Sequence, residues 1–204
     1  MKVNINPHRE NKAWHVEADW VLMVLFYRLS YPHRHTDGAE VLGGSRSTCG
    51  EAFVFAINYI FNTYAPRLSD MSFFKDHFRH FAAYVSSIGC PHDNLIGYID
   101  GNNQPIARPG GDGCVLQNLD QRDFYSRKHK RHSLLWQALC MVNGLVAIWG
   151  PYAGRHHDSA VLGQSQLLDD MRDLGIYLGR NYAFFGDAAY PLGTHCYPVY
   201  KAAA

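Results

Sequence analysis

The chain contains an apolar run, Leu95-Ile-Gly-Tyr-Ile-Asp-Gly101, that closes on a carboxylate and a glycine. A second run, Tyr182-Ala-Phe-Phe-Gly-Asp187, ends in the same two residue types. Short apolar runs bounded by glycine are typical of buried strands. The sequence therefore predicts two strands, with Asp100 and Asp187 at or just past their carboxyl ends.

The residues between these strands predict a hairpin and a helix. Two apolar runs, Leu134 to Val142 and Leu145 to Trp149, are separated by Asn143-Gly144, and this dipeptide is a strong hairpin signal because both residues tolerate positive φ. Residues 159–174 have helical periodicity, with Asp158 at the N-cap. Strand, hairpin, helix and strand predict an α/β fold. If the first and last strands are neighbours, Asp100 and Asp187 meet at one edge of the sheet.

The first part of the chain has a different pattern. Its apolar residues recur at helical spacing, and we expect helices over 17–30, 36–42, from Ser45 through Phe61, and over 71–86. Gly43-Gly44 separates a short helix from a longer one, which is the outline of a helix-turn-helix. Such a segment either reads DNA or belongs to a structural bundle. We therefore expect a helical segment over 1–90 and an α/β domain over 91–204.

The composition excludes several classes of protein. With 204 residues, 47% of them apolar, the chain can form a core and is not globally disordered. Its net charge of +1 excludes a protein that grips nucleic acid over its whole surface, so a DNA site must come from local clustering. No apolar run approaches the roughly 18 to 20 residues of a membrane span, and the first residues lack the apolar core of a signal peptide. We expect neither a membrane protein nor a secreted one.

The two carboxylates are candidate metal ligands. Carboxylates held close together are costly unless a cation lies between them. Hard divalent ions such as Mg²⁺ take oxygen ligands, and a pair of such ions can activate water for phosphodiester cleavage. The alternative is that Asp100 and Asp187 are only turn formers after a strand.

A third acid lies in the motif Gly154-Arg-His-His-Asp158, between the two strands. A histidine beside an aspartate at the start of a helix is a candidate third group at a metal site, or a general base. The alternative is that Asp158 only caps the helix, which would contribute about 1 kcal/mol.

Positive charge is concentrated in one place. Arg122 and the run Arg127-Lys-His-Lys-Arg-His132 lie next to Phe124 and Tyr125. Clustered charges of this kind follow the phosphates of nucleic acids, so the run is a candidate DNA-binding loop or strand edge. The alternative is a solvated loop or a nuclear-targeting patch.

Six short motifs carry a family resemblance. They read Tyr98-Ile-Asp-Gly101, Gln121-Arg-Asp-Phe-Tyr-Ser126, His132-Ser-Leu-Leu-Trp-Gln137, Asn143-Gly-Leu145, Gly150-Pro-Tyr-Ala-Gly-Arg-His-His-Asp158 and Gly186-Asp-Ala-Ala-Tyr-Pro-Leu192. In this order and at nearly this spacing they resemble the nuclease domain of PIF/Harbinger-type transposases, over about residues 95–200. The preceding helical segment resembles the region before that domain.

The resemblance implies an RNase H-like mixed sheet with a DDE-type acid cluster that cuts DNA strands with Mg²⁺ or Mn²⁺. It assigns the catalytic, metal-binding roles to Asp100, Asp158 and Asp187, with His157 and Tyr190 beside them. The residues that would hold the DNA phosphates are Arg122, Arg127, Lys128, Lys130 and Arg131. The implied partners are DNA and a separate DNA-binding protein, and the implied location is the nucleus.

The chain departs from the family pattern at the last acid. The family has a glutamate on a helix after the Gly-Asp strand, whereas this sequence has no glutamate after Glu51. We therefore expect a nuclease domain that lacks its C-terminal part. Two functions stay open, a metal-dependent nuclease and a catalytically inactive relic that binds DNA or a partner protein. An unrelated alternative is a zinc or iron hydrolase that uses His156, His157 and His195.

Overall fold

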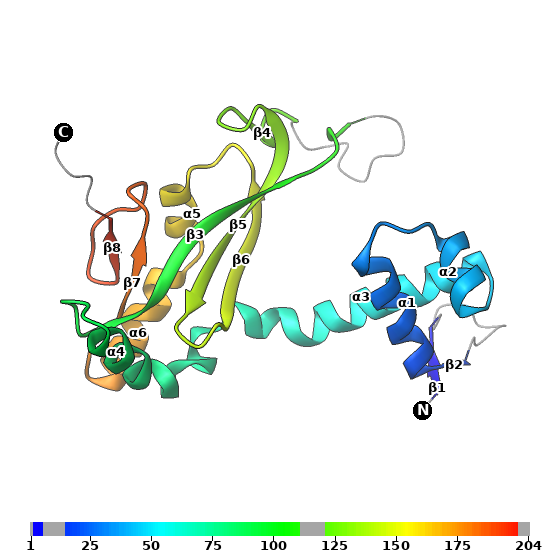
Figure 1. Cartoon of the computed structure of the whole chain (residues 1–204). Coiled ribbons are helices and arrows are strands. Elements are labelled where there is room, and N and C mark those ends of the chain that lie inside the picture. Colours follow the sequence, from blue (N-terminus) through cyan, green and yellow to red (C-terminus); the bar gives the residue numbers. More distant parts are fainter. Residues whose placement is uncertain (1, 6–14, 111–120, 200–204) are drawn as a thin grey trace. The chain divides into compact units, whose positions relative to one another are not determined.

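The computed structural model describes residues 2–5, 15–110 and 121–199 (Figure 1). The chain divides into two compact units, Met1–Pro66 and Arg67–Ala204, each with its own hydrophobic core. Among the described helices, none combines the length and the apolar character that crossing a bilayer requires.

The first unit is mainly helical. Strands β1 (Lys2–Asn4) and β2 (His15–Glu17) pair antiparallel, and they are followed by helices α1 (Ala18–Ser30), α2 (His35–Leu42) and α3 (Arg46–Leu68). The buried faces of α1 and α3 meet in a small core that includes Val21, Leu25, Cys49 and Ala52. The predicted helices over 17–30 and 36–42 are confirmed, and so is the longer helix after Ser45.

The turn between α2 and α3 has the expected chemistry. Gly43 and Gly44 both have positive φ, at 77° and 93°, which residues with a side chain rarely adopt. Ser45 then accepts a hydrogen bond from the backbone N–H of Thr48 at 3.1 Å, which caps the start of α3. The helix-turn-helix outline is therefore present, and DNA binding by this unit stays a prediction.

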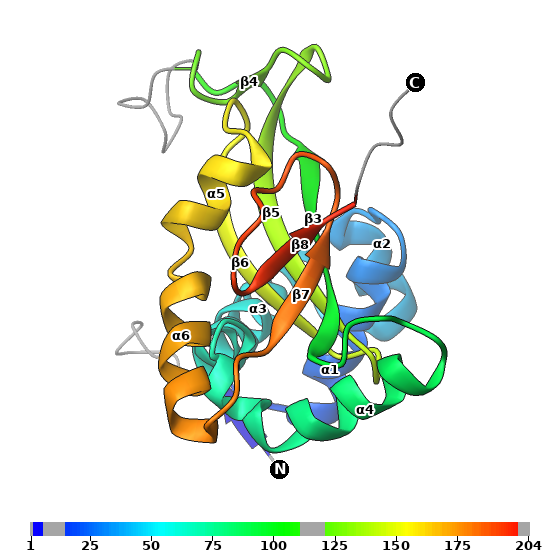
Figure 2. The ribbon, with the colours of Figure 1, turned by 90° about the vertical axis from the view of Figure 1, so that its left-hand side faces the viewer.

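The second unit is a mixed sheet with helices packed against it (Figure 2). Its main strands are β3 (Leu95–Pro105), β5 (Arg131–Met141), β6 (Val146–Ala153), β7 (Ala183–Gly186) and β8 (Cys196–Pro198). Strand β5 pairs antiparallel with both β6 and β3, whereas β3, β7 and β8 pair parallel in that order. The short β4 (Tyr125–Ser126) pairs with the first residues of β5. The first and fourth predicted strands, now β3 and β7, are indeed neighbours.

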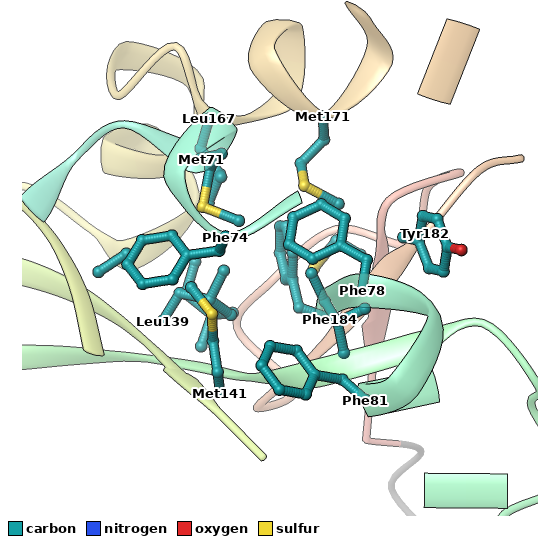
Figure 3. Packing of buried hydrophobic residues seen from close by; sticks show 14 of the residues in the cluster. Met71, Phe74, Phe78, Phe81, Leu139, Met141, Leu167, Met171, Tyr182 and Phe184 are labelled. Carbon is teal, nitrogen blue, oxygen red and sulfur yellow. The ribbon is translucent and has the colours of Figure 1, made fainter. Parts of the chain in front are cut away.

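A single apolar cluster holds the helices against this sheet (Figure 3). Phe184 from β7 and Leu139 from β5 are fully buried in it. Helix α4 (Phe78–Ser87) and helix α6 (Leu167–Leu178) contribute Phe78 and Met171, which are also fully buried. The core therefore lies under β3 and β7, which position Asp100 and Asp187.

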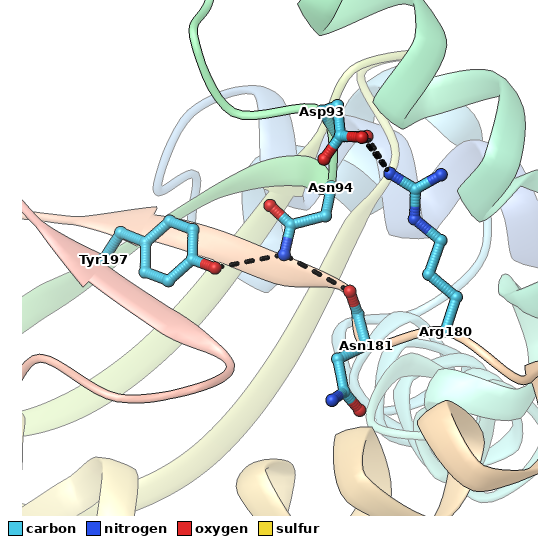
Figure 4. A network of polar contacts seen from close by, with 5 residues as sticks. All are labelled: Asp93, Asn94, Arg180, Asn181 and Tyr197. Atoms are coloured by element: carbon cyan, nitrogen blue, oxygen red, sulfur yellow. Dashed lines mark hydrogen bonds and ion pairs between the residues drawn. The ribbon is translucent and has the colours of Figure 1, made fainter.

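A polar network ties the starts of β3 and β7 to each other (Figure 4). The Arg180 guanidinium forms an ion pair with Asp93 at 2.8 Å, and the Asn94 amide donates to the Asn181 carbonyl and to the Tyr197 hydroxyl at 3.2 and 3.1 Å. Asp93 and Arg180 are exposed, so the pair contributes little stability. The network joins the residues that precede β3 and β7, and the register of the two strands then shifts between Leu95 and Tyr98.

Several predicted elements differ from those observed. Residues 71–86 are two 3-10 turns, Met71–Phe73 and Lys75–His77, followed by α4, and this segment belongs to the second unit because its aromatic side chains pack into that core. The predicted helix over 159–174 is two helices, α5 (Asp158–Gln164) and α6. They are separated at Gln166, whose φ is 58°.

The N-cap prediction for Asp158 is wrong by one residue. His157 occupies the cap position with extended backbone, and Asp158 is the first residue of α5. No side chain caps this helix by a hydrogen bond. The carboxylate of Asp158 is therefore available for another role.

Candidate active site

Asp100 and Asp187 follow neighbouring positions of two parallel strands. The register pairs Tyr98 with Phe185 and Ile99 with Gly186, and each aspartate is the next residue along its chain. Asp100 Oδ1 accepts the Gly101 backbone N–H at 2.8 Å, and Asp187 Oδ1 accepts that of Ala189 at 2.9 Å. One oxygen of each exposed carboxylate is thus held by backbone. The two acids are therefore neighbours, as the strand order predicts. Asp187 follows the end of β7 as expected, but the prediction that Asp100 ends its strand is wrong, because β3 continues to Pro105 in its ladder with β5.

The carboxylate of Asp158 lies directly over Gly101. A β-carbon added to Gly101 would overlap Asp158 Oδ1, so this position must be a glycine for the carboxylate to lie where it does. The φ of Gly101 lies outside the left-handed region, so the backbone conformation does not require a glycine. The steric contact with the Asp158 carboxylate does. Asp158 comes from α5, far from β3 in sequence, yet it lies against the residue that follows Asp100.

The electrostatics of two groups connect all three acids. Partial burial raises the pKa of Asp158, the charges of Asp187 and Asp100 raise it further, and those of Lys128 and His157 oppose this rise. Burial also raises the pKa of Tyr190, and the charges of Asp158, Asp100 and Asp187 act in the same direction. Negative charge is therefore concentrated at this edge of the sheet.

The donor set suits a hard divalent cation. Carboxylate oxygens are the ligands that Mg²⁺ and Mn²⁺ prefer. Gly101 provides a recess beside β3 that the Asp158 carboxylate fills, and the acids repel one another when no cation lies between them. Within the described ranges, no three His, Cys, Asp or Glu side chains converge closely enough to bind one ion as they stand. The carboxylate oxygens are therefore suitable ligands for a hard divalent cation, although the described side chains do not converge on one point.

The raised pKa of Asp158 predicts how stability depends on pH in the metal-free protein. The unfolded chain ionises this group near pH 3.8 and the folded protein ionises it only at higher pH, so stability falls as the pH rises through that interval. Asp158→Asn should therefore raise the melting temperature by a few degrees at pH 7 in the presence of EDTA, and the gain should disappear below about pH 3.8. Thermal unfolding across pH measures this, with Asp173→Asn on α6 as the control. A lower melting temperature at pH 7 would show that Asp158 stabilises the fold.

Tyr190 and Gln137 form a buried pair beneath the acids. Gln137 Nε2 donates to the Tyr190 hydroxyl at 3.4 Å, and both side chains are almost fully buried. Gln137 lies opposite Gly101 in the β3–β5 register. The Tyr190 ring packs closely on Gly186, and a β-carbon added to Gly186 would lie only 2.8 Å from the ring. The Tyr190 ring thus packs against Gly186, the last residue of β7, directly before Asp187.

A cavity of about 1160 Å³ opens beside Asp158. Of the predicted DNA-binding residues, Arg122, Arg127 and Lys128 line it, whereas Lys130 and Arg131 are exposed outside its lining. Two further cations that the sequence pattern does not indicate, Arg108 and Arg155, also line the cavity. They are distant from the basic run in sequence, and only the strand pairing brings them to it.

The histidines of the alternative hydrolase are separated. His156 and His157 line the large cavity, but His195 is buried, with its Nδ1 2.8 Å from the Tyr182 carbonyl oxygen, and it lines a smaller cavity of about 330 Å³. The described residues therefore offer no site that all three histidines share.

Comparisons with known proteins identify one related family. A family model described as DDE superfamily endonuclease matches residues 99–203, just over half of the chain. Neither the curated proteins nor the solved structures give a match. The matched segment contains the three acids and every residue of the basic run.

Proposed function

This chain belongs to the DDE superfamily endonuclease family, and we propose that it is a transposase-like nuclease of the PIF/Harbinger type that cleaves DNA with a divalent metal. The observation that carries the proposal is the recess at Gly101, where the Asp158 carboxylate lies against the middle of β3, next to Asp100. Asp187 follows the neighbouring position on β7.

The strand order supports an RNase H-like fold as part of the proposal. Three antiparallel strands, β3, β5 and β6, come first in the chain, and two strands parallel to β3 follow after the helices. This arrangement puts the first and fourth strands side by side, so that one acid from each reaches the same edge.

In the proposed mechanism, Asp100, Asp158 and Asp187 are the residues that would hold Mg²⁺ or Mn²⁺. A bound ion of this kind lowers the pKa of water and stabilises charge on the leaving oxygen. The backbone N–H groups of Gly101 and Ala189 orient two of the carboxylates, and the positive charge of His157 favours the ionised form of the third. In the hydrolysis a water oxygen bonds to phosphorus and gives up a proton to solvent, the bond to the leaving sugar oxygen breaks, and that oxygen takes a proton from solvent to become a hydroxyl.

The basic residues complete the proposal on the substrate side. Arg122, Arg127, Lys128, Lys130 and Arg131 would hold DNA phosphates near the acids, because clustered cations follow the backbone of nucleic acids. A nuclear location and a separate DNA-binding partner protein are expected on the family resemblance alone.

Cleavage of a supercoiled plasmid tests the proposal. We expect cleavage by the full chain with Mn²⁺ or Mg²⁺ and none with EDTA, and we expect Asp100→Asn or Asp187→Asn to slow it at least about a hundredfold, or about 2.7 kcal/mol of barrier. Calorimetry of Mn²⁺ binding to the same variants separates metal affinity from catalysis.

Asp173→Asn is the matched control, because Asp173 is an exposed aspartate on α6. It should retain both cleavage and Mn²⁺ binding. DNA binding without cleavage in any metal would reject the nuclease and favour the inactive, DNA-binding relic. Cleavage that survives in both the Asp100 and Asp187 variants would reject the assigned site.

A further inference from the structure

The lining of the large cavity beside Asp158 is much more positively charged than the chain as a whole. Its lining contains five arginine or lysine side chains and, within the described residues, one carboxylate, whereas the whole chain has a net charge of only +1. The cations come from separate segments, namely Arg108 after β3, residues 122–128, and Arg155 after β6. A polyanion is the ligand that this concentration of charge favours.

Two of the cations are held by polar contacts with neighbouring side chains. Arg155 forms an ion pair with Asp123 at 2.6 Å, and Arg108 Nε donates to the Gln121 side-chain oxygen at 2.7 Å. Arg127 and Lys128 are exposed, and within the described part of the chain no ion pair joins either of them to a carboxylate. Both side chains can therefore contact phosphates.

The cavity also has an aromatic wall. Tyr125 on β4 pairs directly with His132 on β5, and both residues line the cavity. Their rings meet edge to face, with centroids 5.3 Å apart, and this contact leaves at least one face of each ring free of the other. Tyr125 is 39% exposed, so part of this residue is accessible to a ligand. Proteins that bind unpaired strands combine a positively charged groove with exposed aromatic rings on which the bases stack.

The size of the cavity favours an unpaired strand over a duplex. Its volume of about 1160 Å³ is close to that of small-molecule pockets, which reach about 1,000 Å³. A duplex keeps its bases stacked inside and presents phosphates on both sides of grooves roughly 6 and 12 Å wide. A few unpaired nucleotides fit the space and also offer base faces to the ring.

We propose that this cavity binds a short unpaired stretch of DNA beside the acid cluster, with a base stacked on Tyr125 and the backbone phosphates on Arg127 and Lys128. The identity of the polymer as DNA rests on the proposed function. The binding itself requires no metal, because none of these contacts uses the carboxylates.

Fluorescence anisotropy in EDTA tests the proposal with a labelled oligonucleotide of about 12 nucleotides. The full chain should bind the single strand at least about tenfold more tightly than a blunt duplex of the same sequence. Tyr125→Ala should weaken single-strand binding about tenfold, which is the loss expected for one stacked base, and should leave duplex binding unchanged. Tyr125→Phe should retain wild-type affinity because it keeps the ring.

Tyr177→Ala is the control, because Tyr177 is an exposed tyrosine on α6 outside the cavity lining. It should bind like wild type. An independent readout is salt dependence, since Arg127→Ala should reduce the slope of log affinity against log salt by about 0.7 for one lost phosphate contact.

Equal or tighter binding of the duplex would overturn the proposal, and so would a Tyr125→Ala variant that binds the single strand as tightly as Tyr177→Ala. The circular dichroism spectrum of Tyr125→Phe and Tyr125→Ala separates a lost contact from a lost fold. Because the assay contains no metal, a failure of the nuclease proposal in the plasmid assay would leave these affinities unchanged, and the two proposals fail separately.

Discussion

Gly101→Ala is expected to abolish metal-dependent cleavage and to weaken Mn²⁺ binding by about a hundredfold or more, while the protein stays folded. The added β-carbon would overlap Asp158 Oδ1, so the carboxylate must leave its recess beside β3. The atom that must move is a side-chain oxygen rather than backbone, which is why the strand pairing of Gly101 with Gln137 should survive. Calorimetry with Mn²⁺ and the plasmid assay measure the two losses.

Gly163→Ala is the matched control for this variant. Gly163 lies on α5, the same helix that begins at Asp158, and nothing lies within 4 Å of a β-carbon added there. Alanine in a helix interior is favoured over glycine by about 1 kcal/mol, so this variant should bind metal normally and be slightly more stable. Wild-type Mn²⁺ affinity in Gly101→Ala would show that the position of Asp158 over Gly101 does not matter for the site.

The positions of Asp100 and Asp187 could be predicted because they depend on local sequence. Each aspartate comes after a short run of apolar residues, which is typical of a buried strand. The register of β3 against β7 then makes the two aspartates neighbours. The hairpin at Asn143-Gly144 is local in the same sense, and the structure has it between β5 and β6.

Other features could not be predicted because they depend on contacts between distant segments. The recess at Gly101 exists only because α5 returns to the sheet, and the pattern of residues around Gly101 does not contain that information. The same is true of Arg108 and Arg155, which join the basic run only through the pairing of β3 and β6 with β5. The break at Gln166 was missed because the apolar periodicity of α5 continues into α6.

Phe184→Ala should be the most destabilising single substitution proposed for the second unit. Phe184 is fully buried on β7, within the same cluster as Phe78 and Met171, and removal of such a side chain costs about 3–5 kcal/mol because a cavity is left behind. A domain of this size has only about 5–15 kcal/mol of stability, so the loss is a large share of the total. Urea unfolding followed by circular dichroism should show a midpoint lower by more than about 1 M.

The consequence for the site follows from the position of Phe184 on its strand. Asp187 lies three residues further along, and β7 is held between β3 and β8 chiefly by a short ladder and this buried ring. Phe184→Leu, which keeps most of the buried volume, should lose far less stability, and Leu192→Ala at an exposed position should change stability by less than about 0.5 kcal/mol. If Mn²⁺ affinity falls with stability across these three variants, the packing of β7 holds Asp187 in place. If Phe184→Ala unfolds no more easily than Leu192→Ala, the cluster does not support this strand, and the position of β7 between β3 and β8 depends on its backbone ladders.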